Sequence, residues 1–123
     1  MSKHKVLIVE DEDILRNAYV NVFTIEKFDV TEAANGKKAL ESIAKVQPDV
    51  IILDILMPVM SGIEFLEKVN LVKKYPDVKV LVLSNLSDNT TIELVKSLGA
   101  SKHLVKSSLS PSQLVATVRA LLQ

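Results

Sequence analysis

The feature that most constrains the fold is a set of five short runs rich in β-branched residues. They comprise residues 5–9 (KVLIV), 28–33 (FDVTEA), 49–53 (DVIIL), 78–83 (VKVLVL) and 102–105 (KHLV). Three of the runs are apolar almost throughout, which is typical of strands that are covered on both faces. The runs therefore predict the strands of a parallel sheet that lies between two layers of helices.

Helical patterns follow each of these runs, with apolar residues recurring at the 3.6-residue period. The recurring residues are Ile14, Ala18, Val22 and Ile25; Ala39, Leu40, Ile43 and Ala44; Phe65, Leu66, Val69 and Val72; Ile92, Val95 and Leu98; and Leu114, Val115, Val118 and Leu121. The order of elements is thus strand then helix, five times. This order predicts an α/β fold: an open five-stranded parallel sheet with helices on both faces and right-handed crossovers.

Several residues at the expected helix ends carry capping signals. They are Asn35 before the second helix, Ser61 with Glu64 at capping-box spacing before the third, Gly99 after the fourth, and Ser110 with Pro111 and Gln113 before the last. Each belongs to a type that favours its end of a helix. The caps support the same division into elements.

Composition limits the classes of function. The chain has 123 residues, of which 48% are hydrophobic and 24% charged, so we expect a single domain over residues 1–123. Fifteen basic residues balance fifteen acidic ones, which argues against direct binding to nucleic acid or to an anionic membrane. No cysteine is present, which excludes disulfides and thiolate metal sites, and the first apolar run is too short for a signal peptide. We expect a cytoplasmic protein.

Polar residues follow the strands where the runs end. These residues are Glu10, Asp11 and Glu12 after the first strand, Asp54 after the third, Ser84 and Asn85 after the fourth, and Lys106 after the fifth. The carboxyl ends of parallel strands meet at one edge of a sheet, where ligands bind in such folds. We therefore expect these side chains to lie together.

The residue types at this edge indicate phosphoryl transfer. Carboxylates about 4 Å apart repel by roughly 4 kcal/mol at an effective dielectric constant of 20, and a divalent cation removes that cost. All-oxygen ligation favours Mg²⁺. Asp54 ends an apolar strand and is placed to act as a nucleophile, and Lys106 can compensate an incoming anion.

Four motifs resemble the receiver domains of two-component response regulators, which are CheY-like proteins with a flavodoxin-like fold. The motifs are VLIVEDE, IILDILMPVMSGIEFL, VLVLSN and HLVKS, and together they extend over essentially the whole chain. The resemblance implies a signalling switch. Such a domain is not a general enzyme, because it catalyses only its own phosphorylation and slow dephosphorylation.

The resemblance also implies roles for the acidic residues. Asp54 would accept a phosphoryl group from a histidine kinase or a phosphotransfer protein. Glu10, Asp11 and Asp54 would bind Mg²⁺ together with the backbone carbonyl of Leu56.

The resemblance implies that the remaining motif residues bind the phosphoryl group or respond to it. Ser84 would hydrogen-bond its oxygens, Lys106 would pair with them, and His103 would change orientation on activation. The surface that switches would be formed by the last two helices and the fifth strand. A downstream protein, or an effector domain outside this sequence, would bind that surface.

Three residues near the acceptor are expected to control the lifetime of the phosphoryl group. Leu56 and Leu86 lie two positions after Asp54 and Ser84 and would shield the aspartyl phosphate from water. The alternative is that both leucines only pack at the edge of the core. Asn85 would narrow the access of the phosphoryl group to the site, or its amide would instead hold a water.

The chain departs from the family pattern at the last strand and helix. Lys106 is followed by Ser107 where relatives usually have proline, so we expect a trans bond and a different loop path. Relatives that dimerise through a charged network commonly carry an acid and an arginine where Gln113 and Thr117 stand. We therefore expect a monomer in the unphosphorylated state.

Other functions are less compatible with the motifs. A flavin mononucleotide or dinucleotide site would need a phosphate loop after the first strand, and the chain has only three glycines. A phosphatase of the haloacid dehalogenase type would have a second aspartate at the position of Leu56. The alternative that remains is a receiver-like interaction module that no longer depends on phosphorylation.

Overall fold

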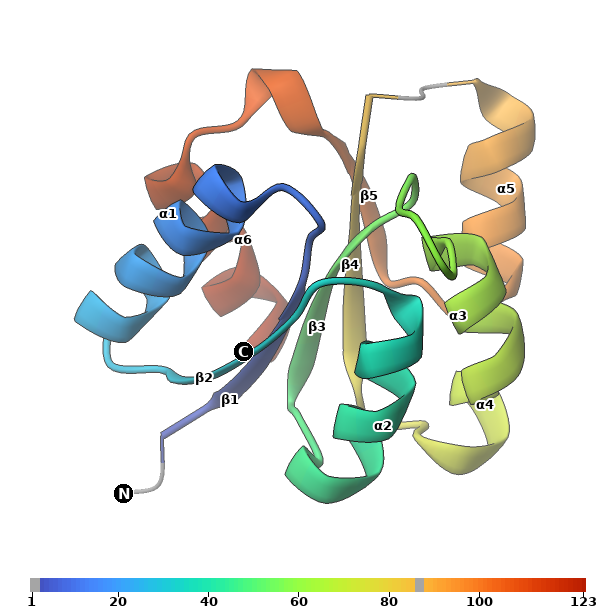
Figure 1. Ribbon diagram of the computed structural model, residues 1–123, viewed down its shortest axis with the longest axis horizontal. Coiled ribbons are helices and arrows are strands. Elements are labelled where there is room, and N and C mark those ends of the chain that lie inside the picture. Colours follow the sequence, from blue (N-terminus) through green and yellow to red (C-terminus); the bar gives the residue numbers. More distant parts are fainter. Residues whose placement is uncertain (1–2, 86–87) are drawn as a thin grey trace.

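The computed structural model describes residues 3–85 and 88–123, and within them the chain forms one five-stranded sheet (Figure 1). The strands are β1 (Lys5–Val9), β2 (Asp29–Ala33), β3 (Val50–Asp54), β4 (Lys79–Ser84) and β5 (Lys102–Val105). All neighbouring strands are parallel, in the order β2-β1-β3-β4-β5. The predicted strands are confirmed to within one residue at each end.

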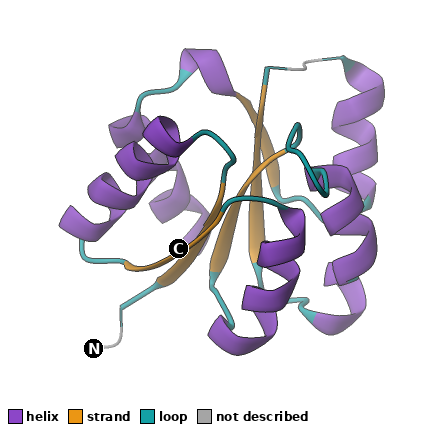
Figure 2. Cartoon of the chain, in the orientation of Figure 1, coloured by secondary structure: helices purple, strands orange, loops and turns teal. Residues whose placement is uncertain are grey.

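Helices cover both faces of the sheet (Figure 2). They are α1 (Asp13–Ile25), α2 (Gly36–Val46), α3 (Gly62–Val69), α4 (Leu71–Lys74), α5 (Asn89–Ser97) and α6 (Pro111–Leu122), with a 3₁₀ turn η1 (Lys106–Ser108) before α6. One face packs against α1 and α6, and the other packs against α2, α3, α4 and α5. The predicted α/β fold with helices on both faces is confirmed.

The central strands form the middle of the core. Successive residues of a strand point to opposite faces, so Val6 and Ile8 pack toward α1 and α6 while Leu7 and Val9 pack toward the other helices. All four are at most 1% exposed. Burial on both faces is the reason that the sequence of β1 is apolar without alternation.

The predicted helix caps are all present. The Asn35 side chain accepts from the backbone N–H of Lys38 at 3.0 Å. Both capping boxes form, one between Ser61 and Glu64 and one between Ser110 and Gln113. Gly99 has the expected positive φ of 108° after α5.

The buried face of the first helix differs from the prediction. Ile14 is 89% exposed and Ile25 is 70% exposed, whereas Tyr19 and Phe23 are at most 3% exposed. Aromatic side chains bury more apolar area than isoleucine. Tyr19 and Phe23 are four residues apart, lie on the same face of the helix, and pack against the sheet. The prediction of a helix is confirmed, but the prediction of its buried face is wrong at both isoleucines.

The third helical pattern is also divided. Asn70 has left-handed backbone angles, with φ 54° and ψ 61°, and separates α3 from α4. Asparagine tolerates this conformation better than most residues. After this break Leu71 is buried, whereas Val72 is 67% exposed. Val72 therefore does not continue the apolar face of α3 as its spacing predicts.

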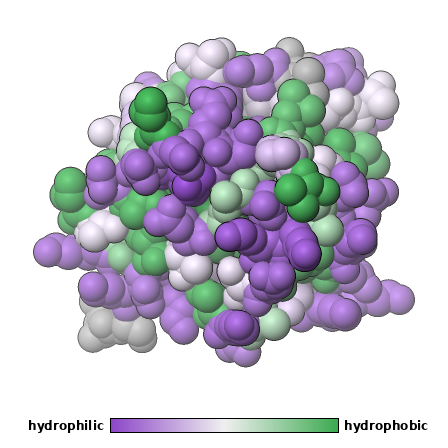
Figure 3. Space-filling model, in the orientation of Figure 1, coloured by the Kyte–Doolittle hydropathy of each residue, from purple (hydrophilic) through white to green (hydrophobic). Residues whose placement is uncertain are grey.

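The outer surface mixes polar and apolar residues. Figure 3 shows one side of the molecule, on which hydrophilic residues predominate and apolar residues form separate small patches. Within the described ranges, no helix combines the length and the apolar character that crossing a bilayer requires.

Candidate functional site

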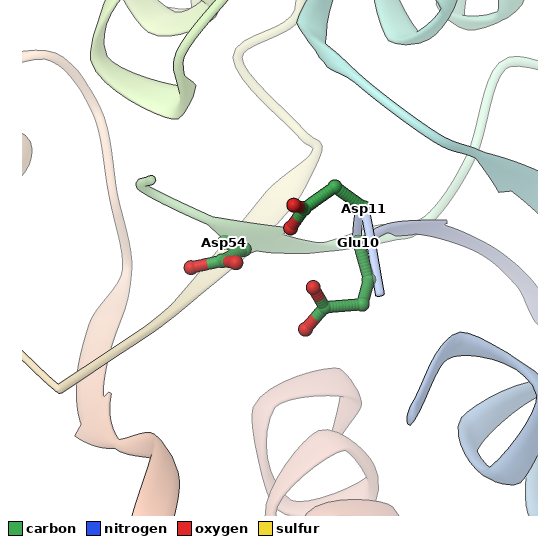
Figure 4. Close-up of side chains that lie close together, drawn as sticks. All are labelled: Glu10, Asp11 and Asp54. Atoms are coloured by element: carbon green, nitrogen blue, oxygen red, sulfur yellow. The ribbon is translucent and has the colours of Figure 1, made fainter. Parts of the chain in front are cut away.

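Three carboxylates meet at the carboxyl edge of the sheet. Glu10 and Asp11 follow β1, and Asp54 is the last residue of β3. One carboxylate oxygen of each lies within 4.8 Å of the other two, and Figure 4 shows the three side chains around a common space. The predicted acidic cluster is therefore brought together by the β1–β3 pairing.

The buried part of β3 that precedes Asp54 restricts its position. Residues 50–53 are at most 1% exposed, and Asp54 itself is 7% exposed. On its far side Gly62 packs so closely that an added Cβ would collide with the Asp54 carbonyl oxygen, and the Gly62 N–H donates to the Ile55 carbonyl at 2.8 Å. Ser61 caps α3, as the sequence predicts, and Gly62 permits the close approach of the backbone to Asp54, so both residues are structural.

Lys106 joins the cluster from the end of β5. Its Nζ lies 2.6 Å from Glu10 Oε1 and donates to Asp54 Oδ2 at 3.1 Å. The side chain is only 11% exposed. Two elements that are distant in the sequence therefore place a cation between two carboxylates, which confirms the predicted proximity of Lys106 to the acids.

Burial determines the protonation of the cluster. Desolvation raises the pKa of Glu10 to about 7, and the charge of Asp54 adds to this while the hydrogen bond to Lys106 opposes it. Burial alone would disfavour the charge on Lys106, but its hydrogen bonds to Glu10 and Asp54 outweigh burial and raise its pKa. The lysine therefore stays charged, whereas the raised pKa favours protonated Glu10 up to about pH 7 unless a further cation stabilises its carboxylate.

The donor set suits a hard divalent cation. Three carboxylate oxygens in one small space, without nitrogen or sulfur ligands among them, match the ligands that Mg²⁺ prefers. Burial raises the pKa of Glu10 although Lys106 lies beside it, and a bound cation would favour the ionised carboxylate. The residues present therefore fit Mg²⁺.

The other predicted phosphoryl-binding residues lie at the ends of β4 and β5. Ser84 is the last residue of β4, is 1% exposed, and pairs in register with Val105, the residue before Lys106. His103 is half-buried in β5 opposite Val82. Its Nε2 is buried and has no hydrogen-bond partner within the described part of the chain. His103 thus lies in β5 below the site and does not join the carboxylates.

The residues predicted to control access are only partly described. The side chain of Leu56 is 63% exposed, so Leu56 does not pack into the core. Asn85 is exposed, and its Oδ1 accepts from the backbone N–H of Ser107 at 3.1 Å. Leu86 lies outside the described residues.

The loop after Lys106 begins with a short 3₁₀ turn. The described residues contain no cis peptide bond, and Lys106–Ser108 form a 3₁₀ turn that leads to the cap of α6. The expected trans bond between Lys106 and Ser107 is confirmed.

One residue at the site was missed by the sequence reasoning. Arg16 of α1 donates to the Glu10 carbonyl at 2.8 Å, to Asp13 Oδ1 at 2.6 Å and to Glu32 Oε1 at 2.9 Å. Its side chain is 13% exposed. The i,i+3 spacing of Asp13 and Arg16 was visible in the sequence, but the bond to β2 depends on the sheet.

Comparison with known families agrees with this geometry. The family model described as "Response regulator receiver domain" matches residues 6–119. The chain is 38% identical over 85 residues to the transcriptional regulatory protein DegU of Brevibacillus brevis. That match covers 68% of this chain and 35% of DegU, so the chain spans about a third of that relative.

Solved structures resemble the chain over nearly its whole length. Chemotaxis protein CheY4 of Vibrio cholerae has a TM-score of 0.88 and 32% identity, and the alignment covers 97% of this chain and 98% of CheY4. A chain of the CheX-CheY-BeF3-Mg²⁺ complex of Borrelia burgdorferi has a TM-score of 0.85 and 27% identity, over 98% of this chain and 90% of that one. With its five parallel strands and its acidic edge, the chain belongs to the response regulator receiver domains, the phosphorylation-dependent switches of two-component systems.

Proposed function

We propose that Asp54 is the phosphoryl acceptor of this receiver domain. The observation that carries the proposal is the position of Asp54: a strand-end carboxylate, 7% exposed, with Glu10 and Asp11 on one side and Lys106 Nζ at 3.1 Å. A nucleophile held by a buried strand needs little further ordering before reaction. Glu10 shares the acidic neighbours and contacts Lys106 at 2.6 Å, but it follows β1 rather than ending a strand, and at 1% exposure it is less accessible to a donor than Asp54.

The metal site supports the same reaction. Glu10, Asp11, Asp54 and the backbone carbonyl of Leu56 would hold Mg²⁺, which supplies positive charge to the phosphoryl oxygens when bound. Asp54 then forms an O–P bond while the P–N bond to the donor histidine breaks, and the imidazole leaves with the electron pair. Lys106 pairs with a phosphoryl oxygen in place of the Asp54 carboxylate oxygen.

Phosphorylation would change the surface formed by α5, β5 and α6. The phosphoryl group adds roughly −1.5 to −2 charges and several acceptor oxygens. Ser84 would turn its hydroxyl toward them and leave space beside β4, and His103 would move into that space. Its register position opposite Val82, two residues before Ser84, supports this coupling.

The partners follow from this chemistry. The donor would be a phosphohistidine of a histidine kinase or of a phosphotransfer protein in the cytoplasm, and the α5–β5–α6 surface would bind a downstream protein or an effector domain. The likeness to a chain of a complex named with CheX, CheY, BeF3 and Mg²⁺ supports binding of a phosphoryl group with its metal.

Labelling by a small acyl phosphate tests the proposed function. Incubation with acetyl phosphate and Mg²⁺ should add one phosphoryl group to the intact mass of the protein. Asp54→Asn should abolish the addition, because the amide is a poor nucleophile. A chelator should abolish it in the wild type.

A matched control is Asp49→Asn, which removes an exposed carboxylate at the opposite end of β3 and should leave labelling unchanged. Labelling that persists in Asp54→Asn, or that proceeds equally in chelator, would contradict the proposal. No labelling of the wild type under any condition would favour an interaction module that does not depend on phosphorylation.

A further inference from the structure

The ends of β4 and β5 are joined by a hydrogen bond beyond the last paired residues of the sheet. The backbone pairing of these strands ends at Ser84 and Val105. The Oδ1 of Asn85 then accepts from the Ser107 N–H at 3.1 Å, across 22 residues of sequence. A side chain thus continues the connection between the two strands after the backbone ladder has stopped.

This bond satisfies a backbone group that has no local cap. Ser107 lies in the first turn of η1, where N–H groups have no partner within the helix. Val105, which precedes η1, supplies no side-chain cap. Asn85 therefore caps the 3₁₀ turn from a different segment of the chain.

The two joined residues are direct neighbours of the residues proposed to bind the phosphoryl group. Asn85 follows Ser84, and Ser107 follows Lys106. The Ser84 hydroxyl and the Lys106 ammonium therefore belong to residues directly beside the two that the bond connects. A bond that restricts the ends of the two strands before the anion arrives lowers the entropy lost on binding.

We propose that Asn85 is a positioning residue, which holds the ends of β4 and β5, and with them Ser84 and Lys106, at a fixed separation by accepting the hydrogen bond from the Ser107 N–H. The proposal rests on the proposed function, because it assigns Asn85 a role in binding the phosphoryl group. In this role Asn85 needs no contact with that group. It acts through the backbone of its neighbours, which distinguishes it from a residue that only narrows access.

Binding of beryllofluoride, an unreactive mimic of the phosphoryl group, measures this role directly. The dissociation constant is determined by calorimetric titration in the presence of Mg²⁺. Asn85→Ala should weaken binding roughly two- to tenfold, the range expected for one hydrogen bond. Ser108→Ala alters an exposed residue of the same turn and should bind as the wild type does.

A double-mutant cycle separates the hydrogen bond from the bulk of Asn85. Ser107→Pro removes the donor N–H, so Asn85→Ala should have almost no further effect in that background. Proline also restricts Lys106, but this restriction is the same in both members of the compared pair. If Asn85 acted only by narrowing the access of the ligand to the site, Asn85→Ala would change beryllofluoride binding equally in the wild type and in Ser107→Pro. That result would overturn the proposal.

Hydrogen exchange provides a second measurement that does not need the proline variant. The Ser107 amide should exchange two- to tenfold faster in Asn85→Ala than in the wild type, by the same hydrogen-bond argument. Unchanged exchange and unchanged beryllofluoride binding in Asn85→Ala would refute the positioning role and leave the proposed function intact. A wild type that binds no beryllofluoride with Mg²⁺ would refute the proposed function and this inference together.

Discussion

Glu10 shows at the scale of one residue how burial sets chemistry. Its side chain is almost fully buried beside Asp54, and desolvation raises its pKa to about 7. The raised pKa means that the metal-free folded protein binds this proton more tightly than the unfolded chain does. As pH rises from about 4.5 to about 7, this residue therefore lowers the free energy of unfolding of the metal-free protein.

The same proton should control the affinity for Mg²⁺. A carboxylate must lose its proton to bind a metal, so the dissociation constant should fall about tenfold per pH unit below 7 and level off above it. Titration calorimetry between pH 5.5 and 8.5 measures this dependence. Glu10→Gln should bind Mg²⁺ more weakly and with a flatter pH dependence in that range, and an unchanged slope in Glu10→Gln would assign the proton to another group.

Leu56 gives a second prediction at the residue scale. Its 63% exposed side chain can cover the approach of water to Asp54, because it is not committed to the core. Leu56→Asn adds a polar group that can orient water, so the aspartyl phosphate should decay about tenfold faster or more. The loss of phosphorylated mass after removal of the donor measures this rate.

Val59 provides the control for Leu56. It lies in the same loop, is 76% exposed and has a φ of 68°, a conformation that asparagine tolerates better than valine. Val59→Asn should therefore keep the wild-type decay rate. Equal decay in wild type and Leu56→Asn would show that Leu56 does not shield the phosphate.

At the scale of elements, β4 connects the site to the surface formed by α5, β5 and α6. Ser84 ends β4, and the register pairs β4 with β5 up to Val105. Within β5, the Nε2 of His103 is buried without a hydrogen-bond partner among the described residues, so no such bond fixes it in place. The proposed coupling is that a change at Ser84 alters the packing of β5 through these neighbouring strands.

Ser84→Ala should separate phosphorylation from switching. The variant keeps Asp54 and the acidic residues, so it should still be labelled by acetyl phosphate. It should lose most of the change in hydrogen exchange that phosphorylation causes in α5, β5 and α6, because the hydroxyl that follows the phosphoryl group is absent. Exchange changes of wild-type size in Ser84→Ala would contradict the coupling.

At the scale of the whole molecule, the outer face of α6 shows no charged pair available for dimerisation at the expected positions. Gln113 is part of the capping box with Ser110, and Thr117 donates to the Gln113 carbonyl at 2.9 Å. Arg119 is already paired at 2.8 Å with Glu26, the residue that follows α1. These groups are satisfied within one chain.

The unphosphorylated protein should therefore sediment as a monomer at tens of micromolar. Raising the salt concentration should not change its sedimentation coefficient, because no charged interface is involved. Charge reversal at Arg119 (Arg119→Glu) replaces the exposed pair with Glu26 by two like charges and removes the hydrogen bond to the Glu26 carbonyl, so it should reduce stability by roughly 1 kcal/mol or more while the protein stays monomeric. A stable dimer of the wild type would contradict the prediction.

The sequence by itself determined the order of the elements and the residues of the acidic edge. Apolar runs that do not alternate can be satisfied only between two layers, and parallel strands bring their carboxyl ends together. Asp54, Ser84 and Lys106 could therefore be assigned to one edge from their positions in the chain alone. The caps at Asn35, Ser61 and Ser110 were equally local, because each depends on residues three positions apart.

The tertiary structure decided what depends on distant contacts. The buried face of α1 is set by how Tyr19 and Phe23 meet the sheet, and a helical period alone cannot choose between that row and the exposed Ile14 and Ile25. The bond from Arg16 to Glu32 and the bond from Ser107 to Asn85 join segments 16 and 22 residues apart. Such pairs leave no periodic signal in the sequence, because only the packing of the strands brings them within hydrogen-bond distance.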